Sequence, residues 1–208
     1  MYLFSRECVV ASGEAMAPAK AISDYVTGTR GRELALYSIA YSAAWNRLTF
    51  STWVDDLAAM EEMTATLAAD SKYQELLLAF GPFVSIVNDN LFNVVHSTST
   101  ETGLAFPNVV WSVTGVAKIS KIVEVTIGGA QICDAWKAAT GVDATFGSAV
   151  TGQFGGIGWL SGYESFDEFD KAQSVSRSSE PWIAAMVGIQ DSVSDELGAG
   201  VSTLYRKM

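Results

Sequence analysis

Histidine is almost missing from this 208-residue sequence, because His96 is the only one. A two-histidine metal site and an HExxH metalloprotease helix are therefore excluded, and we expect no metal centre. Cysteine is nearly as rare. Cys8 and Cys133 stand far apart and neither belongs to a CxxC pair, so we interpret them as two small buried thiols rather than a disulfide.

Clusters of positive charge and long apolar runs are also missing. The chain has 13 basic against 23 acidic residues, for a formal net charge of -10, which disfavours nucleic acid and anionic membranes as partners. No apolar run approaches the roughly 18–20 residues that span a bilayer. Arg6 and Glu7 interrupt the stretch where a signal peptide needs an uncharged segment. We therefore expect a cytoplasmic protein.

What the sequence does contain is a repeated pattern. Residues 48–60 return as residues 157–169 at a constant separation of 109 positions, and the same shift pairs Tyr73 with Trp182. Hydrophobic residues make up 49% of the chain and charged residues 17%, which is enough apolar material for a sizeable core. The pattern predicts two copies of a unit of roughly 100 residues that share a core.

Each copy is predicted to have the order β-α-β-β-α-β, the split ferredoxin-like motif. Alternating and β-branched segments predict strands at 2–10, 33–41, 47–54, 91–95, 109–117, 144–150, 156–163 and 201–206. Residues 119–127 also have strand composition, so 109–127 could be one bent strand or two. Apolar residues at three- and four-residue spacing predict the helices, including 73–80, 166–176 and 181–189.

The Ser/Thr-rich segment 98–108, which contains Gly103 and Pro107, is predicted to connect a first repeat, 1–97, to a second, 109–208. In the first helix of each repeat, the apolar stripes match at a separation of 116. Equivalent residues of the two copies are 116 positions apart in the first helix but 109 positions apart from the third strand onward. This difference predicts that the second copy lacks seven residues in the loop after its first helix.

At the third strand and the following helix, the sequence shows Phe50-x-Thr52-x-Val54-Asp55-Asp56-Leu57-x-x-Met60. The second copy has Trp159-x-Ser161-x-Tyr163-Glu164-Ser165-Phe166-x-x-Phe169. This pattern resembles the dimeric α+β barrel superfamily, which includes antibiotic-biosynthesis-monooxygenase-like, EthD-like and stress-responsive barrel proteins. The resemblance implies an α+β fold in which two tandem ferredoxin-like repeats pack sheet to sheet as an intramolecular α/β barrel.

The resemblance further implies a ligand held between sheet and helices or inside the barrel. Haem-degrading members of the superfamily carry a ligand histidine on a helix, and residues 58–70 and 167–176 contain none. We therefore expect no haem and no other cofactor. His96 and Tyr41 are the candidate catalytic residues, with a strand-end surface histidine as the plainer interpretation of His96.

The candidate ligand-binding residues lie on two strands. Gly156, Gly158 and Gly162 share one face of the strand 156–163, where missing side chains leave space for a flat ligand or for close packing of another segment. The matching strand offers hydroxyls and an indole, namely Thr49, Ser51 and Trp53.

Aromatic residues are frequent, and they predict either an aromatic cavity or ordinary core packing. They include Tyr37, Tyr41, Trp45, Trp53, Trp111 and Trp159. We expect a protein that binds a small hydrophobic or aromatic molecule. One hypothesis is a cofactor-independent monooxygenase or cyclase acting on an aromatic or polyketide-like substrate. The alternative is a non-catalytic binding or assembly module, and a homo-oligomer is left open.

Overall fold

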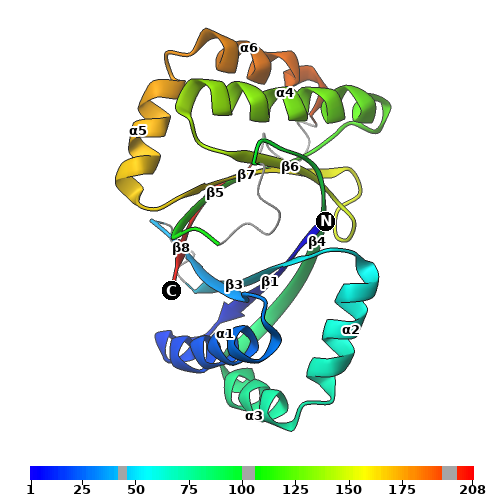
Figure 1. Ribbon diagram of the computed structural model, residues 1–208, viewed down its shortest axis with the longest axis vertical. Helices are drawn as coiled ribbons and strands as arrows, with labels where there is room; N and C mark the ends of the chain where they lie inside the picture. Colours follow the sequence, from blue (N-terminus) through cyan, green and yellow to red (C-terminus); the bar gives the residue numbers. More distant parts are fainter. Residues whose placement is uncertain (42–45, 100–105, 194–200) are drawn as a thin grey trace. The chain divides into compact units, whose positions relative to one another are not determined.

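The computed structural model describes residues 1–41, 46–99, 106–193 and 201–208. Within them the order β-α-β-β-α-α-β occurs twice (Figure 1). The first set is β1 (Tyr2–Val10), α1 (Met16–Arg30), β2 (Ala35–Ile39), β3 (Arg47–Val54), α2 (Leu57–Ala68), α3 (Ser71–Phe80) and β4 (Val84–Ser97). The second set is β5 (Val109–Val116), α4 (Ile122–Thr140), β6 (Ala144–Ala149), β7 (Gly156–Tyr163), α5 (Phe166–Ser176), α6 (Glu180–Gly188) and β8 (Val201–Lys207).

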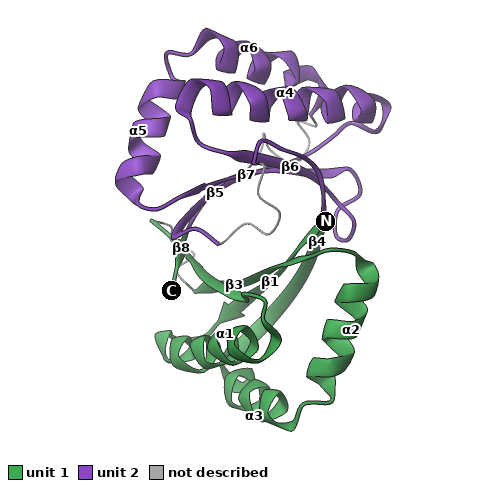
Figure 2. Ribbon diagram, viewed as in Figure 1, with its two compact units in different colours: residues 1–91, 206–208 green, residues 92–205 purple. Residues whose placement is uncertain are grey.

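The strands are hydrogen-bonded in the order β1-β3-β2-β8-β5-β7-β6-β4, which is that of a closed barrel. The predicted fold class, α+β with ferredoxin-like repeats forming a barrel, is confirmed. The chain divides into two compact units, here called unit 1 (Met1–Leu91 with Arg206–Met208) and unit 2 (Phe92–Tyr205) (Figure 2). The division into 1–97, 98–108 and 109–208 stays a prediction, and part of that connector, 100–105, lies outside the described residues.

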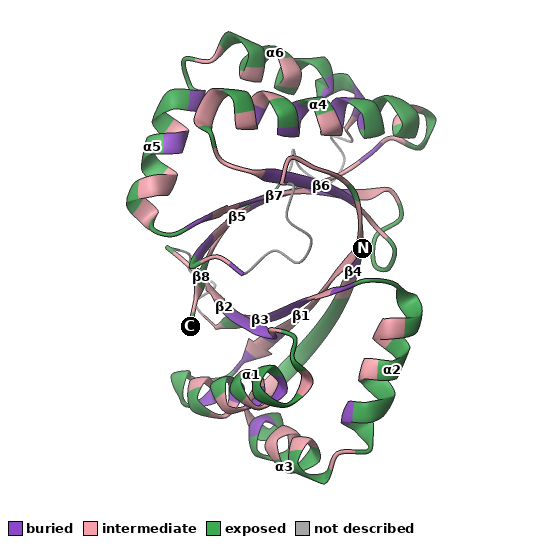
Figure 3. Cartoon of the chain, in the orientation of Figure 1, coloured by how far each residue is buried: buried purple, intermediate pink, exposed green. Residues whose placement is uncertain are grey.

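In unit 1 the alternation of strand side chains decides which residues form the core. Strands β1 and β3 pair antiparallel, with Cys8 opposite Leu48. Cys8, Leu48 and Phe50 therefore point to the same side of the sheet, where helices α1 and α3 cover them. Helix α1 buries Ile22 and Val26 against this face, as its apolar stripe predicts. Figure 3 shows that α1 carries both buried and exposed residues along its length.

The two later helices of unit 1 begin at carboxylate caps. Asp56 Oδ1 accepts a hydrogen bond from the Ala59 backbone N–H at the start of α2, where the sequence predicts a helix start. Asp70 caps α3 and also accepts a hydrogen bond from the hydroxyl of Tyr25. These hydrogen bonds hold the pKa of Asp70 below its ordinary value, so its carboxylate stays charged at neutral pH.

Unit 2 repeats this design, and its register corrects the predicted alignment of the first helices. Both α1 and α4 end at a glycine in the left-handed region, Gly31 (φ 64°) and Gly141 (φ 75°). Counting back from these caps, buried Ile22 corresponds to buried Ile132, a separation of 110 rather than 116. The predicted seven-residue deletion is therefore wrong, because the 116 alignment matched similar residues on helix positions with different burial.

The structure also answers the question about residues 109–127. They form one strand, β5, followed by a short 3-10 turn and then by α4 from Ile122, so the predicted strand at 119–127 is wrong. The β-branched residues there favour a strand by propensity alone. Val125, Gly129 and Ile132 are buried at helical spacing against the sheet, and this packing outweighs the local preference.

Candidate functional site

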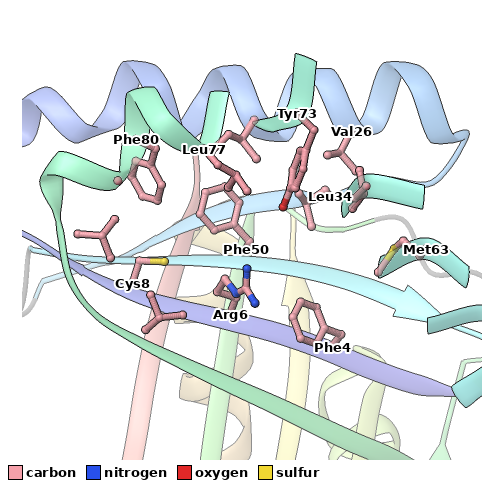
Figure 4. Close-up of a pocket in the computed structure, with 15 residues that line it drawn as sticks. Phe4, Arg6, Cys8, Val26, Leu34, Phe50, Met63, Tyr73, Leu77 and Phe80 are labelled. Carbon is pink, nitrogen blue, oxygen red and sulfur yellow. The ribbon is translucent and has the colours of Figure 1, made fainter. Parts of the chain in front are cut away.

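A cavity of about 200 Å³ lies inside unit 1, between the sheet and its three helices (Figure 4). Its walls come from β1, β3, the start of β4 and all three helices, together with residues next to them. The lining residues are Phe4, Arg6, Cys8, Ile22, Val26, Leu34, Phe50, Met63, Leu67, Tyr73, Leu77, Phe80, Gly81, Val84 and Val87. Almost all of these side chains are apolar, so the space suits an apolar guest.

Among the described residues, Arg6 is the only charged one that lines the cavity, and one carboxylate holds its guanidinium. Its Nε and Nη2 atoms each donate a hydrogen bond of 2.7 Å to the carboxylate of Asp89 on β4. Its guanidinium carbon lies 5.9 Å from the centre of the Phe4 ring, a cation–π distance. No hydrogen bond from Nη1 to any described residue occurs, so this donor is available to a ligand.

Tyr73 and Cys8 supply the other polar groups of the wall. Figure 4 shows the Tyr73 hydroxyl pointing from α3 toward the sheet, in the direction of the Arg6 guanidinium. Burial raises the pKa of the Tyr73 phenol and raises the pKa of the Cys8 thiol to about 11. Both groups are therefore protonated at neutral pH, and neither is a ready base or nucleophile.

The corresponding place in unit 2 is filled with indole rings. Trp136 lies five residues before the capping glycine of α4, as Val26 does in α1, and Trp182 lies three residues after its helix cap, as Tyr73 does. Trp111 on β5 pairs with Ser161 on β7, and Phe4 on β1 pairs with Thr52 on β3. Because Thr52 and Ser161 are equivalent positions of the repeat, Trp111 occupies in unit 2 the place that Phe4 occupies in unit 1.

These three tryptophans pack directly on one another. The ring centroids of Trp136 lie 5.0 Å from those of Trp111 and 4.8 Å from those of Trp182, and Trp136 is only 1% exposed. The same position in the two units is therefore open and apolar in one and occupied by aromatic side chains in the other.

The predicted ligand-binding residues of unit 1 do not line this cavity. Thr49, Ser51 and Trp53 lie on the face of β3 that points away from α1 and α3, because they alternate with the core residues of that strand. Tyr41 follows β2 with a positive φ of 53° and is 87% exposed. The structure therefore places Thr49, Ser51 and Trp53 together on one face of β3, and Tyr41 does not line the cavity.

The predicted glycine face lies on β7 in unit 2. Gly156, Gly158 and Gly162 alternate with residues that face the helices, so they point to the other side of the sheet. A Cβ atom added to Gly162 would lie 2.5 Å from Cγ of Pro107, and close packing is enough to explain a glycine there. Gly158 has more room, with Phe92 at 3.5 Å. Ligand binding at this face stays a prediction.

His96 lies near the end of β4 and is paired with a carboxylate. Its Nε2 is 2.8 Å from Oδ1 of Asp134 on α4, and its side chain is 32% exposed. In the register of β4 and β6, His96 stands opposite Phe146, whose ring lies in the core under the helices. His96 is therefore on the opposite face of the sheet from the glycines. Trp45 lies outside the described residues.

The residues that distinguish the cavity were not identified from the sequence. Arg6, Asp89 and Tyr73 come from three elements, and only the fold brings them together. The sequence does contain one signal for Arg6. Alternate residues of a strand face the same side of the sheet, so Arg6 faces the same side as Phe4 and Cys8, which is the side of the core. A charged residue among the core-facing positions of a strand is unusual and marks a candidate functional position, and here the Arg6 side chain is 38% exposed and paired with Asp89.

Two classes of feature are missing from the part of the chain that the structure describes. No helix there combines the length and apolar character required to cross a bilayer. No cluster of three or more histidine, cysteine, aspartate or glutamate side chains is placed there to hold a metal ion.

Comparison with known proteins identifies the fold. No protein-family profile and no curated protein matches the sequence. Among solved structures, a candidate monooxygenase from Fusobacterium nucleatum is similar with a TM-score of 0.73 and 13% identity, covering 99% of this chain and 91% of that one. A candidate monooxygenase from Lactobacillus acidophilus has a TM-score of 0.70 and 9% identity over 99% and 93%.

A third structure, of an anthrone oxidase-like protein, has a TM-score of 0.61 and 12% identity over 100% of this chain and 91% of that one. At such low identities the likeness concerns the fold. The comparisons support the α+β barrel fold that the predicted resemblance implies.

The cavity leads to a prediction about thiol reactivity. Cys8 lines the cavity, whereas Cys133 is fully buried in the core of unit 2 and burial raises its pKa to about 12. Burial raises the pKa of both thiols, so both are largely protonated at neutral pH, and access to the thiol distinguishes them. We expect a small apolar thiol reagent to modify Cys8 faster than Cys133, because Cys8 lines the cavity, and an apolar cavity ligand to slow only Cys8.

Mass spectrometry of timed digests measures the two rates separately in one sample. Both rates should rise about tenfold per pH unit between pH 8 and 10, because the thiolate is the reacting form. Equal rates for the two cysteines would contradict an accessible cavity beside Cys8.

Proposed function

We propose that this protein binds a small, largely apolar molecule, about one aromatic ring in size, in the cavity of unit 1. The observation that supports this function is the contrast between the units: the position that tryptophans fill in unit 2 is an apolar space of about 200 Å³ in unit 1. An empty apolar space forfeits the dispersion contacts that stabilise a core. A ligand that fills the cavity restores those dispersion contacts, so an empty cavity of this kind favours ligand binding.

The volume narrows the size of the molecule. An apolar cavity of about 150 Å³ is large enough to hold benzene, whereas drug-sized ligands occupy roughly 300–1,000 Å³. The cavity of about 200 Å³ therefore suits a single substituted ring. A fused three-ring polyketide would exceed it, so the ligand proposed for this site is smaller than the polyketide-like substrate predicted from the sequence.

Binding with catalysis is the more specific form of this function. Two structures with the same fold are described as candidate monooxygenases and a third as anthrone oxidase-like. A cofactor-independent monooxygenase or cyclase would use such a cavity to exclude water and position its substrate. Binding without catalysis is favoured by one observation: burial keeps the Tyr73 phenol and the Cys8 thiol protonated, so neither is poised as a general base.

Filling the cavity tests the function. Replacing Val26 with tryptophan places in unit 1 the residue that α4 carries at the corresponding position. We expect single-ring aromatics such as ethylbenzene and acetophenone to shift the methyl NMR signals of Met63 and Leu77 in the natural protein. In Val26→Trp we expect affinity to fall by more than tenfold, because the indole occupies the ligand's space.

The matched control is Val187→Trp, since Val187 is a valine on α6 that is 61% exposed. This control should bind as the natural protein does, and circular dichroism should show that all three proteins are folded. The function is wrong if no single-ring aromatic shifts these signals at millimolar concentration, or if a folded Val26→Trp binds with unchanged affinity. Oxygen consumption in the presence of a bound compound separates a monooxygenase from a binding protein.

A further inference from the structure

The polar groups that face the cavity are hydrogen-bond donors. Arg6 Nη1 has N–H groups with no partner among the described residues, and the Tyr73 hydroxyl points toward the same region (Figure 4). Within the described chain, no residue lining the cavity has a carboxylate, amide or imidazole side chain. The Arg6 side chain is 38% exposed, so water can reach its guanidinium in the unliganded protein. A purely apolar ligand that displaces this water would leave the donors without a partner, which costs binding free energy.

The charge of the site is balanced before any ligand arrives. Asp89 accepts two hydrogen bonds of 2.7 Å from Arg6, so the guanidinium already has a bidentate carboxylate partner. A second carboxylate, brought by a ligand, would add an uncompensated negative charge beside apolar side chains such as Phe4 and Phe50. A ligand ammonium group would find hydrogen-bond donors and no side-chain acceptor among the described residues that line the cavity. The site therefore matches an acceptor that carries no charge.

We propose that the ligand is an uncharged aromatic carbonyl compound, whose carbonyl oxygen accepts hydrogen bonds from Arg6 Nη1 and the Tyr73 hydroxyl while its ring fills the apolar space. This assignment rests on the proposed function and adds the chemical class of the ligand. The ring lies among side chains such as Val26, Phe50 and Leu77. Arg6 and Tyr73 then decide which ring compounds bind, and Asp89 decides the charge that is accepted.

Three compounds of nearly equal size separate shape from polarity: acetophenone, ethylbenzene and benzoate. We expect acetophenone to bind at least tenfold tighter than ethylbenzene, because a hydrogen bond from a charged donor contributes more than a neutral one. We expect benzoate to bind at least tenfold more weakly than acetophenone. Isothermal calorimetry, with methyl NMR to place the ligand in the cavity, provides the three dissociation constants.

Two substitutions test the assigned roles. Tyr73→Phe should weaken acetophenone binding about three- to tenfold and leave ethylbenzene unchanged, since it removes only the hydroxyl. Asp89→Asn should strengthen benzoate binding at least fivefold, because the Arg6 charge is then free to pair with the ligand. The matched control is Tyr163→Phe, which removes a buried hydroxyl that has no hydrogen-bond partner among the described residues of unit 2. It should change no affinity.

The outcomes separate this inference from the function on which it rests. If ethylbenzene and acetophenone bind equally well, the carbonyl assignment is overturned while the cavity remains a binding site. If benzoate binds more tightly than acetophenone to the natural protein, the neutral class is overturned. If none of the three compounds binds, the proposed function itself has failed.

Discussion

Replacing Trp136 with alanine is expected to lower the free energy of unfolding by about 3 kcal/mol. Trp136 is 1% exposed and packs between the rings of Trp111 and Trp182. Truncation of a buried tryptophan costs about 3–5 kcal/mol, from lost transfer free energy and the void left behind. The Trp136 Nε1 donor has no hydrogen-bond partner among the described residues, and its removal offsets part of that cost. Urea denaturation measures the difference.

A rescue experiment tests the reason for this loss. Indole added to Trp136→Ala should raise the unfolding midpoint, because it refills the space that the side chain vacated. The same addition should have little effect on Trp182→Ala, whose side chain is only partly buried and leaves a more open space. If Trp136→Ala loses less than about 1 kcal/mol, the three rings are not the packed centre that the structure shows.

The second large effect is expected at Gly129 on α4. A Cβ atom there would lie 2.6–2.7 Å from three ring atoms of Phe146, a buried side chain that is 1% exposed. Overpacking of this kind costs about 1–3 kcal/mol, and alanine regains up to about 1 kcal/mol of helix propensity over glycine. With three contacts to one rigid ring, we expect Gly129→Ala to destabilise the protein by about 2 kcal/mol, measured by urea denaturation.

The matched substitution on α1 should have the opposite sign. Gly28 lies on an exposed part of that helix, and a Cβ atom there would meet nothing within 4 Å. Gly28→Ala should therefore stabilise the protein by about 0.4–1 kcal/mol, through helix propensity and a less flexible unfolded chain. Stabilisation by both substitutions would show that the Phe146 ring can move aside, contrary to the close packing of α4 on β6.

Local patterns place most strands and short helices of this fold, but β4 extends over Val84–Ser97 where only 91–95 is predicted, and β2 covers Ala35–Ile39 where 33–41 is predicted. The alternation in β1, β3 and β7 gives their bounds as the structure has them, and the stripe of α5 does the same. The prediction failed at residues 119–127, where local β propensity and the helical spacing of buried residues disagree. Such a conflict is resolved only by the partner surface, which a single sequence does not reveal.

The candidate site was harder to predict for a geometric reason. The alternation of side chains along β3 predicts that Thr49, Ser51 and Trp53 share one face of the sheet, and the structure agrees. The cavity, however, lies on the other face. A cavity is a shortage of side-chain volume among several elements, so no single stretch of sequence records it. Its clearest trace is a difference between the copies, where Val26 and Tyr73 correspond to Trp136 and Trp182.

The uneven placement of tryptophan determines which optical signals report on each half of the chain. Four of the six tryptophans, Trp111, Trp136, Trp159 and Trp182, belong to unit 2, whereas Trp53 belongs to unit 1, on the face of β3 that points away from the cavity. Among the described residues, no tryptophan lines the cavity. Intrinsic emission therefore reports mainly on the unfolding of unit 2 and should change little when a compound enters the cavity. Tyr73 and the methyl groups near it are the natural spectroscopic reporters of occupancy.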